Sequence, residues 1–368
     1  MPEKKKQHYV PVFYLKRFSP DGRSIGLWNI QSKKKVPAAS LKSQCCENFF
    51  YEQGENIENS LSDLESQASK VLRGIDRDGS LPPAWHRNYE ILRRYIFTQL
   101  FRTKYMTDEI NSMLDQFKGT VTQNNPHLLR INGHTKEEFE EIVEEFKGNT
   151  PEFSIVVAYS DRVKKTTPDL KSKLLINKTK VEFLTSDHPV ILYNQLLNFM
   201  SSFGIPGSRT GLPAKGLQVF FPISPTKLML FYDPTSYQVG HSQRRNVPIR
   251  HKQEVLDINI LQMCSAHENI YFKNETFDID TLYNRAKPYM RRMQNDFNKQ
   301  NFNVQKERES GLIHMHGSRP DINTDLKPSF IRIMQDAKLY RTNIKEKIEA
   351  GHSIPAILLR ESLGNLSI

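Results

Sequence analysis

The chain contains 368 residues, of which 38% are hydrophobic and 10% aromatic, and its formal net charge is +11. This length predicts one large domain with additions, or one domain with an arm, and the apolar content excludes a disordered chain. The basic start, Met1 to Lys6, leads into no apolar segment of a secretory signal, and no run approaches the ~18–20 continuous apolar residues of a membrane helix. We therefore expect a cytoplasmic protein that does not enter a membrane.

The charge balance and the cysteines indicate which partners and which cellular compartment to expect. Lys and Arg outnumber Asp and Glu by 52 to 41, and a field of this sign attracts nucleic acid or another polyanion. Basic residues dispersed along a chain also fit a solvated surface that serves solubility, so both interpretations stay open. The three cysteines, Cys45, Cys46 and Cys264, make no disulfide framework and lack the spacing of a thiolate metal site. They fit a reducing compartment.

The first half of the chain is expected to be mostly helical. Pro11 suits the first position of a short helix, and residues 24–36 predict a hairpin. Apolar residues then recur at helical spacing along three segments. The first is residues 57–79, and the second is a long helix that begins at Pro82-Pro83 and ends near Gly119. The third is residues 135–148, where Thr135 and Glu138 have capping-box spacing.

The second half reads as a sheet. Short apolar and β-branched runs predict strands at residues 153–159, 174–177, 181–185, 190–193, 217–223 and 227–232. A glycine-rich loop covers 203–216, and a last core helix, 254–267, precedes a strand at 269–272. The expected fold class is α+β, with a helical N-terminal half packed on a mainly antiparallel sheet. Residues 1–290 would form this domain, and residues 291–368 a polar, basic arm whose stretch 330–348 predicts a terminal helix.

Ordered motifs accompany these elements. They are His8-Tyr9-Val10-Pro11-x-Phe13-Tyr14-Leu15-x-x-Phe18, Asn48-Phe49-Phe50-Tyr51, Leu64-Glu65, Gln99 with Arg102-Thr103, Thr185-Ser186-Asp187-His188-Pro189-Val190, Pro222-Ile-Ser-Pro225 and Asn259. Over about residues 8–285 the chain thereby resembles a bacterial family known as domain of unknown function 4238. It departs from that pattern at Val12, where a polar residue is expected, and at His188, where Asn is common. The resemblance implies a shared fold and no particular activity.

Asp187 lies between two predicted strands, where a carboxylate at a strand end can serve as a metal ligand or a general base. The structural alternative is an Asx turn, in which the carboxylate accepts bonds from the nearby backbone while Pro189 fixes the exit. With His188 it could bind a divalent ion, the cofactor that this motif suggests. Because neighbouring residues of a strand face opposite ways, both could bind one ion only at a bend.

His8 stands among apolar and aromatic residues, so its imidazole is expected to be partly buried. An imidazole titrates near neutral pH and could act as a general acid or base, or as a metal ligand. A buried histidine that merely tethers the N-terminus is the alternative.

Helical positions supply the other candidates. Glu65 has capping-box spacing from Ser62, and it would border the buried stripe if its helix began earlier. Gln99 and Arg102 are neighbours at i, i+3 on the long helix. Arg102 could grip a phosphate or carboxylate with two hydrogen bonds, or form a structural pair with Glu65. Asn259, carried by the resemblance, joins Arg102 and Gln99 as a predicted substrate-binding residue.

No nucleophile elbow, phosphate-binding glycine loop, dinucleotide fingerprint or zinc-protease motif is present. The leading hypothesis is a hydrolase or nuclease-like enzyme for a phosphate-bearing or nucleic-acid substrate. In it His8, Asp187 and Glu65 are catalytic, and Asp187 doubles as the metal ligand. The alternative is a non-catalytic binding or regulatory protein whose basic surface binds a partner.

Overall fold

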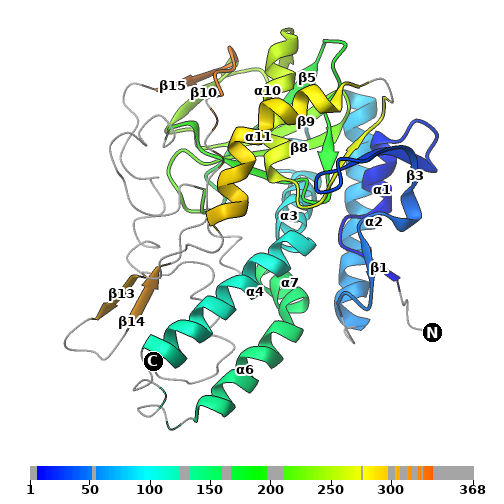
Figure 1. Cartoon of the computed structure of the whole chain (residues 1–368). Helices are drawn as coiled ribbons and strands as arrows, with labels where there is room; N and C mark the ends of the chain where they lie inside the picture. Colours follow the sequence, from blue (N-terminus) through cyan, green and yellow to red (C-terminus); the bar gives the residue numbers. More distant parts are fainter. Residues whose placement is uncertain are drawn as a thin grey trace.

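The computed structural model describes residues 6–51, 55–124, 135–159, 167–196, 210–274, 277–296, 303–306, 313–316 and 326–334, with isolated residues 129, 133, 322 and 324. Its helices and sheets have the predicted α+β character: the N-terminal half is largely helical, and most strands of the second half pair antiparallel (Figure 1). No helix in these ranges is long and apolar enough to cross a membrane.

Among the described residues, a short first helix and five longer α-helices carry much of the N-terminal half. In chain order the helices are α1 (Val12–Leu15), α2 (Glu55–Asp78), α3 (Arg87–Phe101), α4 (Lys104–Gly119), α6 (Lys136–Gly148) and α7 (Thr150–Tyr159). Helices α4, α6 and α7 pack on one another and extend away from the sheets, while α3 leads from the sheets to them (Figure 1). Single-turn 3-10 helices, Lys16–Phe18 and Leu41–Ser43, and a π-helical turn, Thr120–Asn124, complete this half.

Two predictions about these helices were wrong. The long helix expected up to Gly119 is broken between α3 and α4, because Thr103 adopts an extended backbone (φ −87°, ψ 154°). The apolar periodicity continues across this break, so periodicity alone does not reveal where α3 ends. The strand expected at 153–159 is helix α7, which packs on α3 and α4 and is apolar nearly all round. Periodicity does not distinguish a buried helix from a buried strand over so short a run.

The larger sheet has the order β11-β5-β9-β8-β7. All of its pairs are antiparallel except β11 with β5, which are parallel and place β11 at the edge. Its strands are β5 (Lys171–Asn177), β7 (Ile191–Tyr193), β8 (Gln218–Ser224), β9 (Lys227–Tyr232) and β11 (Asn246–Ile249). The antiparallel sheet predicted from the second half is thus present, with an added parallel edge strand.

The smaller sheet joins the two halves of the chain. Its order is β3-β2-β12-β6, so the N-terminal hairpin pairs with strands from beyond residue 180. Its strands are β2 (Ser24–Asn29), β3 (Lys35–Ser40), β6 (Thr185–Ser186) and β12 (Asn269–Phe272). The strand predicted at 181–185 is therefore reduced to its last residue and Ser186.

Three two-stranded pairs and two helices complete the described chain. The pairs are β1 (Lys6–His8) with β4 (Cys46–Asn48), β10 (Tyr237–Val239) with β15 (Ile331–Ile333), and β13 (Asn303–Lys306) with β14 (Ile313–His316). The helices are α10 (Lys252–Ser265) and α11 (Ile279–Asp296), which pack together. Because β15 is a strand, the terminal helix predicted from Phe330 is wrong at its start, and residues 335–348 lie outside the described part. The domain boundary at 290 stays a prediction.

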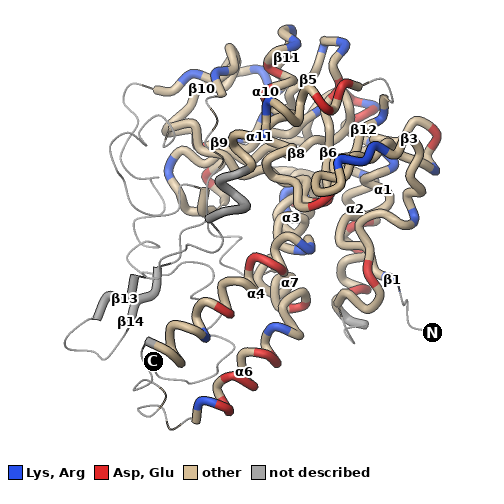
Figure 2. The backbone as a smooth tube through the Cα atoms, in the orientation of Figure 1, with Lys and Arg blue, Asp and Glu red and all other residues tan. Residues whose placement is uncertain are grey.

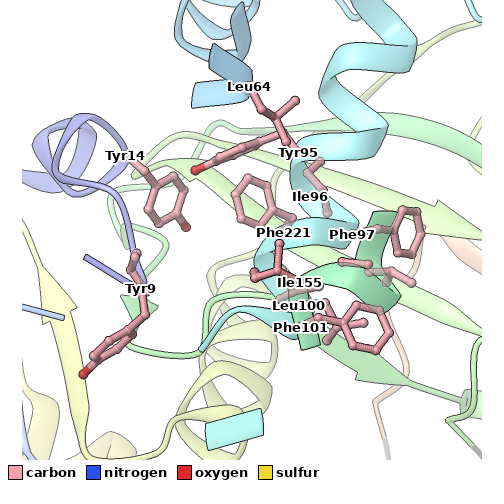
Figure 3. Packing of buried hydrophobic residues seen from close by; sticks show 14 of the residues in the cluster. Tyr9, Tyr14, Leu64, Tyr95, Ile96, Phe97, Leu100, Phe101, Ile155 and Phe221 are labelled. Carbon is pink, nitrogen blue, oxygen red and sulfur yellow. The ribbon is translucent and has the colours of Figure 1, made fainter. Parts of the chain in front are cut away.

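Aromatic side chains join the helices to the larger sheet. Tyr14 of α1 stacks on Phe221 of β8 with ring centroids 5.0 Å apart, and Tyr95 of α3 meets the same ring edge-on at 6.1 Å (Figure 3). The Tyr14 hydroxyl also donates to the Pro222 carbonyl oxygen at 2.8 Å. Burial and offset ring contacts each stabilise such a junction. The opening motif therefore docks onto the sheet and lies close to α3.

Candidate functional site

Arg102 lies just past α3 and is only 3% exposed. Each of its three nitrogens donates a hydrogen bond: Nη1 to Glu65 Oε1 at 2.7 Å, Nε to Tyr51 Oη at 3.2 Å, and Nη2 to the His8 carbonyl oxygen at 2.6 Å. Although burial opposes its charge, the contacts with Tyr51 and Glu65 raise the pKa of Arg102 above its ordinary value. A permanently charged guanidinium therefore ties α2, α3 and the opening strand together.

Gln99 continues this arrangement one turn earlier on α3. Its Nε2 donates to the Tyr9 carbonyl oxygen at 2.8 Å, and the side chain is fully buried. Residues at i and i+3 of a helix lie on one face. Gln99 and Arg102 consequently hold the carbonyl groups of two consecutive residues, Tyr9 and His8.

His8 presents its ring near the same ion pair. Its Nε2 is buried and has no hydrogen-bond partner among the described residues. Burial lowers the pKa of His8, with smaller effects from a bond to the Lys42 backbone and from the charges of Lys6, Glu65 and Arg102. The imidazole is therefore neutral at pH 7.

Asp187 is 2% exposed, and its carboxylate accepts three backbone N–H groups. His267 N donates to Oδ1 at 2.9 Å, and Glu268 N and Asn269 N donate to Oδ2 at 2.7 and 2.9 Å. Burial raises the pKa of Asp187, against the charge of His267 and the three amides, which lower it. The carboxylate thus anchors the connection between α10 and β12. Within the described ranges, no three His, Cys, Asp or Glu side chains are grouped to hold a metal ion.

His188 faces away from Asp187. Its Nδ1 lies 2.7 Å from Thr103 Oγ1, and its ring centroid lies 4.5 Å from that of Tyr105. The two side chains therefore contact different elements, although both residues lie in a bend that follows β6.

Asn259 braces α10 against the segment before β6. Its Nδ2 donates to the Glu182 carbonyl oxygen at 2.9 Å, and its Oδ1 accepts Leu184 N at 3.0 Å. Both ends of the amide are thereby bonded to the backbone of one loop.

The structure brings His8, Glu65, Gln99 and Arg102 together, whereas Asn259 lies in a separate contact. Asp187 lies close enough to the opening motif to act on Tyr9. Burial raises the pKa of the Tyr9 phenol most, and the charges of Cys45 and Asp187 raise it further.

A second charged group was missed by the sequence analysis. His267 Nε2 lies 2.9 Å from Asp108 Oδ2 and 4.0 Å from Glu268 Oε1. Burial opposes protonation of His267, but the bond to Asp108 and the charges of Asp187, Asp108 and Glu268 raise its pKa. Asp108 stands on the first turns of α4, so this pair could be foreseen only with the helix break at Thr103 in view.

Exposed cations gather around strands β5 and β11, a region we call the basic edge. Residues 240–253 contain four Lys or Arg and no Asp or Glu. The basic edge consists of Lys171, Lys178, Lys180, Arg244, Arg245, Arg250 and Lys252. Figure 2 shows Lys and Arg around β5, β10 and β11, whereas Asp and Glu predominate along α6. In the part of the chain that the structure describes, none of these seven side chains forms an ion pair.

The parallel pairing assembles the basic edge from distant segments. Leu174 N donates to the Arg245 carbonyl oxygen at 3.0 Å, and Lys178 N to the Ile249 carbonyl oxygen at 2.9 Å. Buried Lys173 donates from Nζ to the carbonyl oxygens of His241, at 2.9 Å, and Arg244. One internal lysine thereby holds the turn that presents two exposed arginines.

Comparisons with known proteins agree with the motifs. The model of a family described as "Protein of unknown function (DUF4238)" matches residues 6–276. No curated protein and no solved structure matches the chain.

Proposed function

The chain belongs to the DUF4238 family of proteins of unknown function, and from that starting point we propose that it is a cytoplasmic protein that binds nucleic acid through the basic edge. The observation that carries this proposal is the gathering of seven exposed cations in and next to strands β5 and β11, none of which forms an ion pair with another described residue. Phosphates that bind such cations release condensed counterions, which supplies most of a sequence-independent affinity.

Neighbouring contacts favour this function over mere solubility. Lys173 holds the turn at 241–244, and hydrogen bonds at the two ends of the β5–β11 ladder hold the backbone of Arg245 and Lys178, so these cations are presented by ordered backbone. Pre-ordered groups lose less conformational entropy on binding. Residues that served solubility alone would need no such support.

The test is affinity for labelled DNA and RNA, measured by fluorescence anisotropy at several salt concentrations. The double variant Arg244→Gln/Arg245→Gln removes two charges from the basic edge. Lys34→Gln/Lys70→Gln removes two exposed charges elsewhere and serves as the matched control. We expect the first variant to bind at least about tenfold more weakly, with a salt slope reduced by up to ~1.8. Equal affinities for the two variants would refute the proposal.

One observation favours a second candidate, a hydrolase or nuclease-like enzyme. Among the described residues His8 Nε2 has no hydrogen-bond partner, and the charge of the partly exposed Glu65 carboxylate acts on the same ring, so the pair could exchange a proton with a substrate that approaches Glu65. Arg102 and Asp187 would position this site through their backbone contacts. We would incubate wild type and His8→Gln with DNA, RNA and nucleotides, with and without divalent metal. Product formation that is lost in a folded His8→Gln protein supports the enzyme, and no turnover by wild type rejects it.

A further inference from the structure

Trp85 is the most exposed large apolar side chain in the described ranges. It is 84% exposed, whereas the second tryptophan, Trp28, is completely buried. A single exposed hydrophobic residue is ordinary on a protein surface. Trp85 differs from such a residue because its segment contacts the strands that carry the basic edge.

Both ends of the segment that carries Trp85 are bonded to strands β11 and β5, at residues that adjoin members of the basic edge. Asn246 Nδ2 donates to the Gly79 carbonyl oxygen at 2.7 Å, which attaches the start of the segment to β11. Beyond Trp85, Tyr89 Oη donates to Ser172 Oγ at 2.9 Å, which attaches α3 to the start of β5. The segment that carries the indole therefore runs along the end of the basic edge that carries Lys171, Arg244 and Arg245.

The backbone around Trp85 is itself constrained. Two prolines, Pro82 and Pro83, precede it, and His86 N donates to the Pro83 carbonyl oxygen at 2.9 Å. His86 Nδ1 accepts Asn88 N at 3.0 Å and caps α3, and exposed Arg87 follows. Fixed φ angles and a capped helix reduce the entropy that the segment would lose on binding.

We propose that Trp85 is a stacking platform for a nucleobase and that the basic edge prefers single-stranded nucleic acid. This inference rests on the proposed binding function. A flat aromatic ring beside backbone-tracking cations is the arrangement that binds single strands, because every unpaired base offers a π-face. In a duplex those faces are already stacked, so only the phosphates remain available to the basic edge.

The experiment compares wild type, Trp85→Ala and Trp85→Tyr for binding to short oligothymidylate and to a duplex of equal length. Because the side chain is exposed, these substitutions leave the core unchanged. For the single strand we expect Trp85→Ala to weaken binding about 5- to 150-fold, the range that stacking of one base supplies, with recovery in Trp85→Tyr. Affinity for the duplex should change much less. Oligothymidylate should also quench the exposed tryptophan fluorescence of wild type.

The outcomes separate the two proposals. Equal single-strand affinity in wild type and Trp85→Ala, without quenching, overturns the stacking role while duplex binding still supports the basic edge. An equal loss for both nucleic acids also overturns it, because stacking would act on the single strand alone. If wild type binds neither, the proposed function itself fails.

Discussion

Polar side chains in the family motifs hold backbone groups of distant segments. Gln99 and Arg102 bind the carbonyls of Tyr9 and His8, and Asp187 binds three consecutive amides. A buried backbone group that loses its hydrogen-bond partner raises the free energy of the folded state, so each contact holds two distant segments together. The motifs thus describe how segments that are far apart in the sequence are held together within each half of the chain.

Asp187→Asn should destabilise the protein by at least about 2 kcal/mol. Asparagine keeps one acceptor oxygen and replaces the other with an NH2 group, which would face a backbone N–H instead of accepting its hydrogen bond. Hydrogen bonds to charged groups contribute ~1.5–3 kcal/mol each, and this contribution would be lost. Urea unfolding followed by circular dichroism measures the change. Asp21→Asn is the matched control, since Asp21 also accepts two backbone N–H groups but in an exposed turn. Equal effects of the two substitutions would contradict the anchoring role of Asp187.

His267 should make stability depend on pH near neutrality. Its folded pKa is raised because Asp108, Asp187 and Glu268 surround it. A histidine with a raised folded pKa stabilises fully below its unfolded value of about 6.5, and this contribution disappears as pH rises through the folded value. As the pH rises above about 6.5, the urea midpoint of wild type should therefore decrease relative to the midpoint of His267→Gln. Parallel curves for the two proteins would exclude this linkage.

The helices and strands divide into those that local sequence determines and those that packing determines. Helix α6 has both hydrogen bonds of the capping box that Thr135 and Glu138 predict, and α2 follows its apolar stripe. The break at Thr103 and the helical state of 153–159 depend on contacts with other elements. Tertiary packing overrides local pattern at such places.

The candidate site was predictable to a similar extent. The interaction between Glu65 and Arg102 was foreseen as a structural pair and is present at 2.7 Å. By contrast, the pairing of β5 with β11 joins residues some 70 positions apart, so sequence spacing could not reveal the basic edge. Arg244 and Arg245 are adjacent in the sequence, but strand β11, which follows them, was not predicted.

Gly26 controls the pairing of β2 with β12. A Cβ at Gly26 would lie 2.4 Å from the Phe272 ring and 2.9 Å from its carbonyl oxygen, at a register shift in β2. Gly26→Ala should therefore destabilise by about 1–3 kcal/mol. In Gly74→Ala the new methyl meets nothing within 4 Å inside α2, so this control should stabilise by about 0.5–1 kcal/mol. Thermal unfolding of both variants measures the effects, and destabilisation of similar size in both would refute the steric argument.

At the scale of the molecule, charge and packing are unevenly distributed. The basic edge lies on the larger sheet, whereas α6 is strongly acidic and extends away from it (Figure 2). A nucleic acid would be attracted to the sheet and repelled from this helix, which orients its approach. Strand β15, which follows α11 in the chain, pairs with β10, which directly precedes the basic residues 240–253.

Residues 326–334, together with Ile322 and Thr324, contact elements that precede α11. Ile322, Leu326 and Ile331 are buried, and Ser329 N and Oγ donate to Glu254 Oε1 at 2.7 and 2.6 Å. Leaving buried Glu254 without these donors costs about 1–3 kcal/mol, and the lost apolar burial adds to it.

Two truncations test this attachment. A chain that ends at residue 321 should be at least ~2 kcal/mol less stable than the full protein, even after the regained chain entropy offsets part of the lost burial. A chain that ends at residue 334 keeps every contact named above and should unfold at a higher urea concentration than the chain that ends at residue 321. Equal midpoints for both truncations would show that 322–334 contributes nothing to the body, and the boundary at 290 would then describe the stable unit.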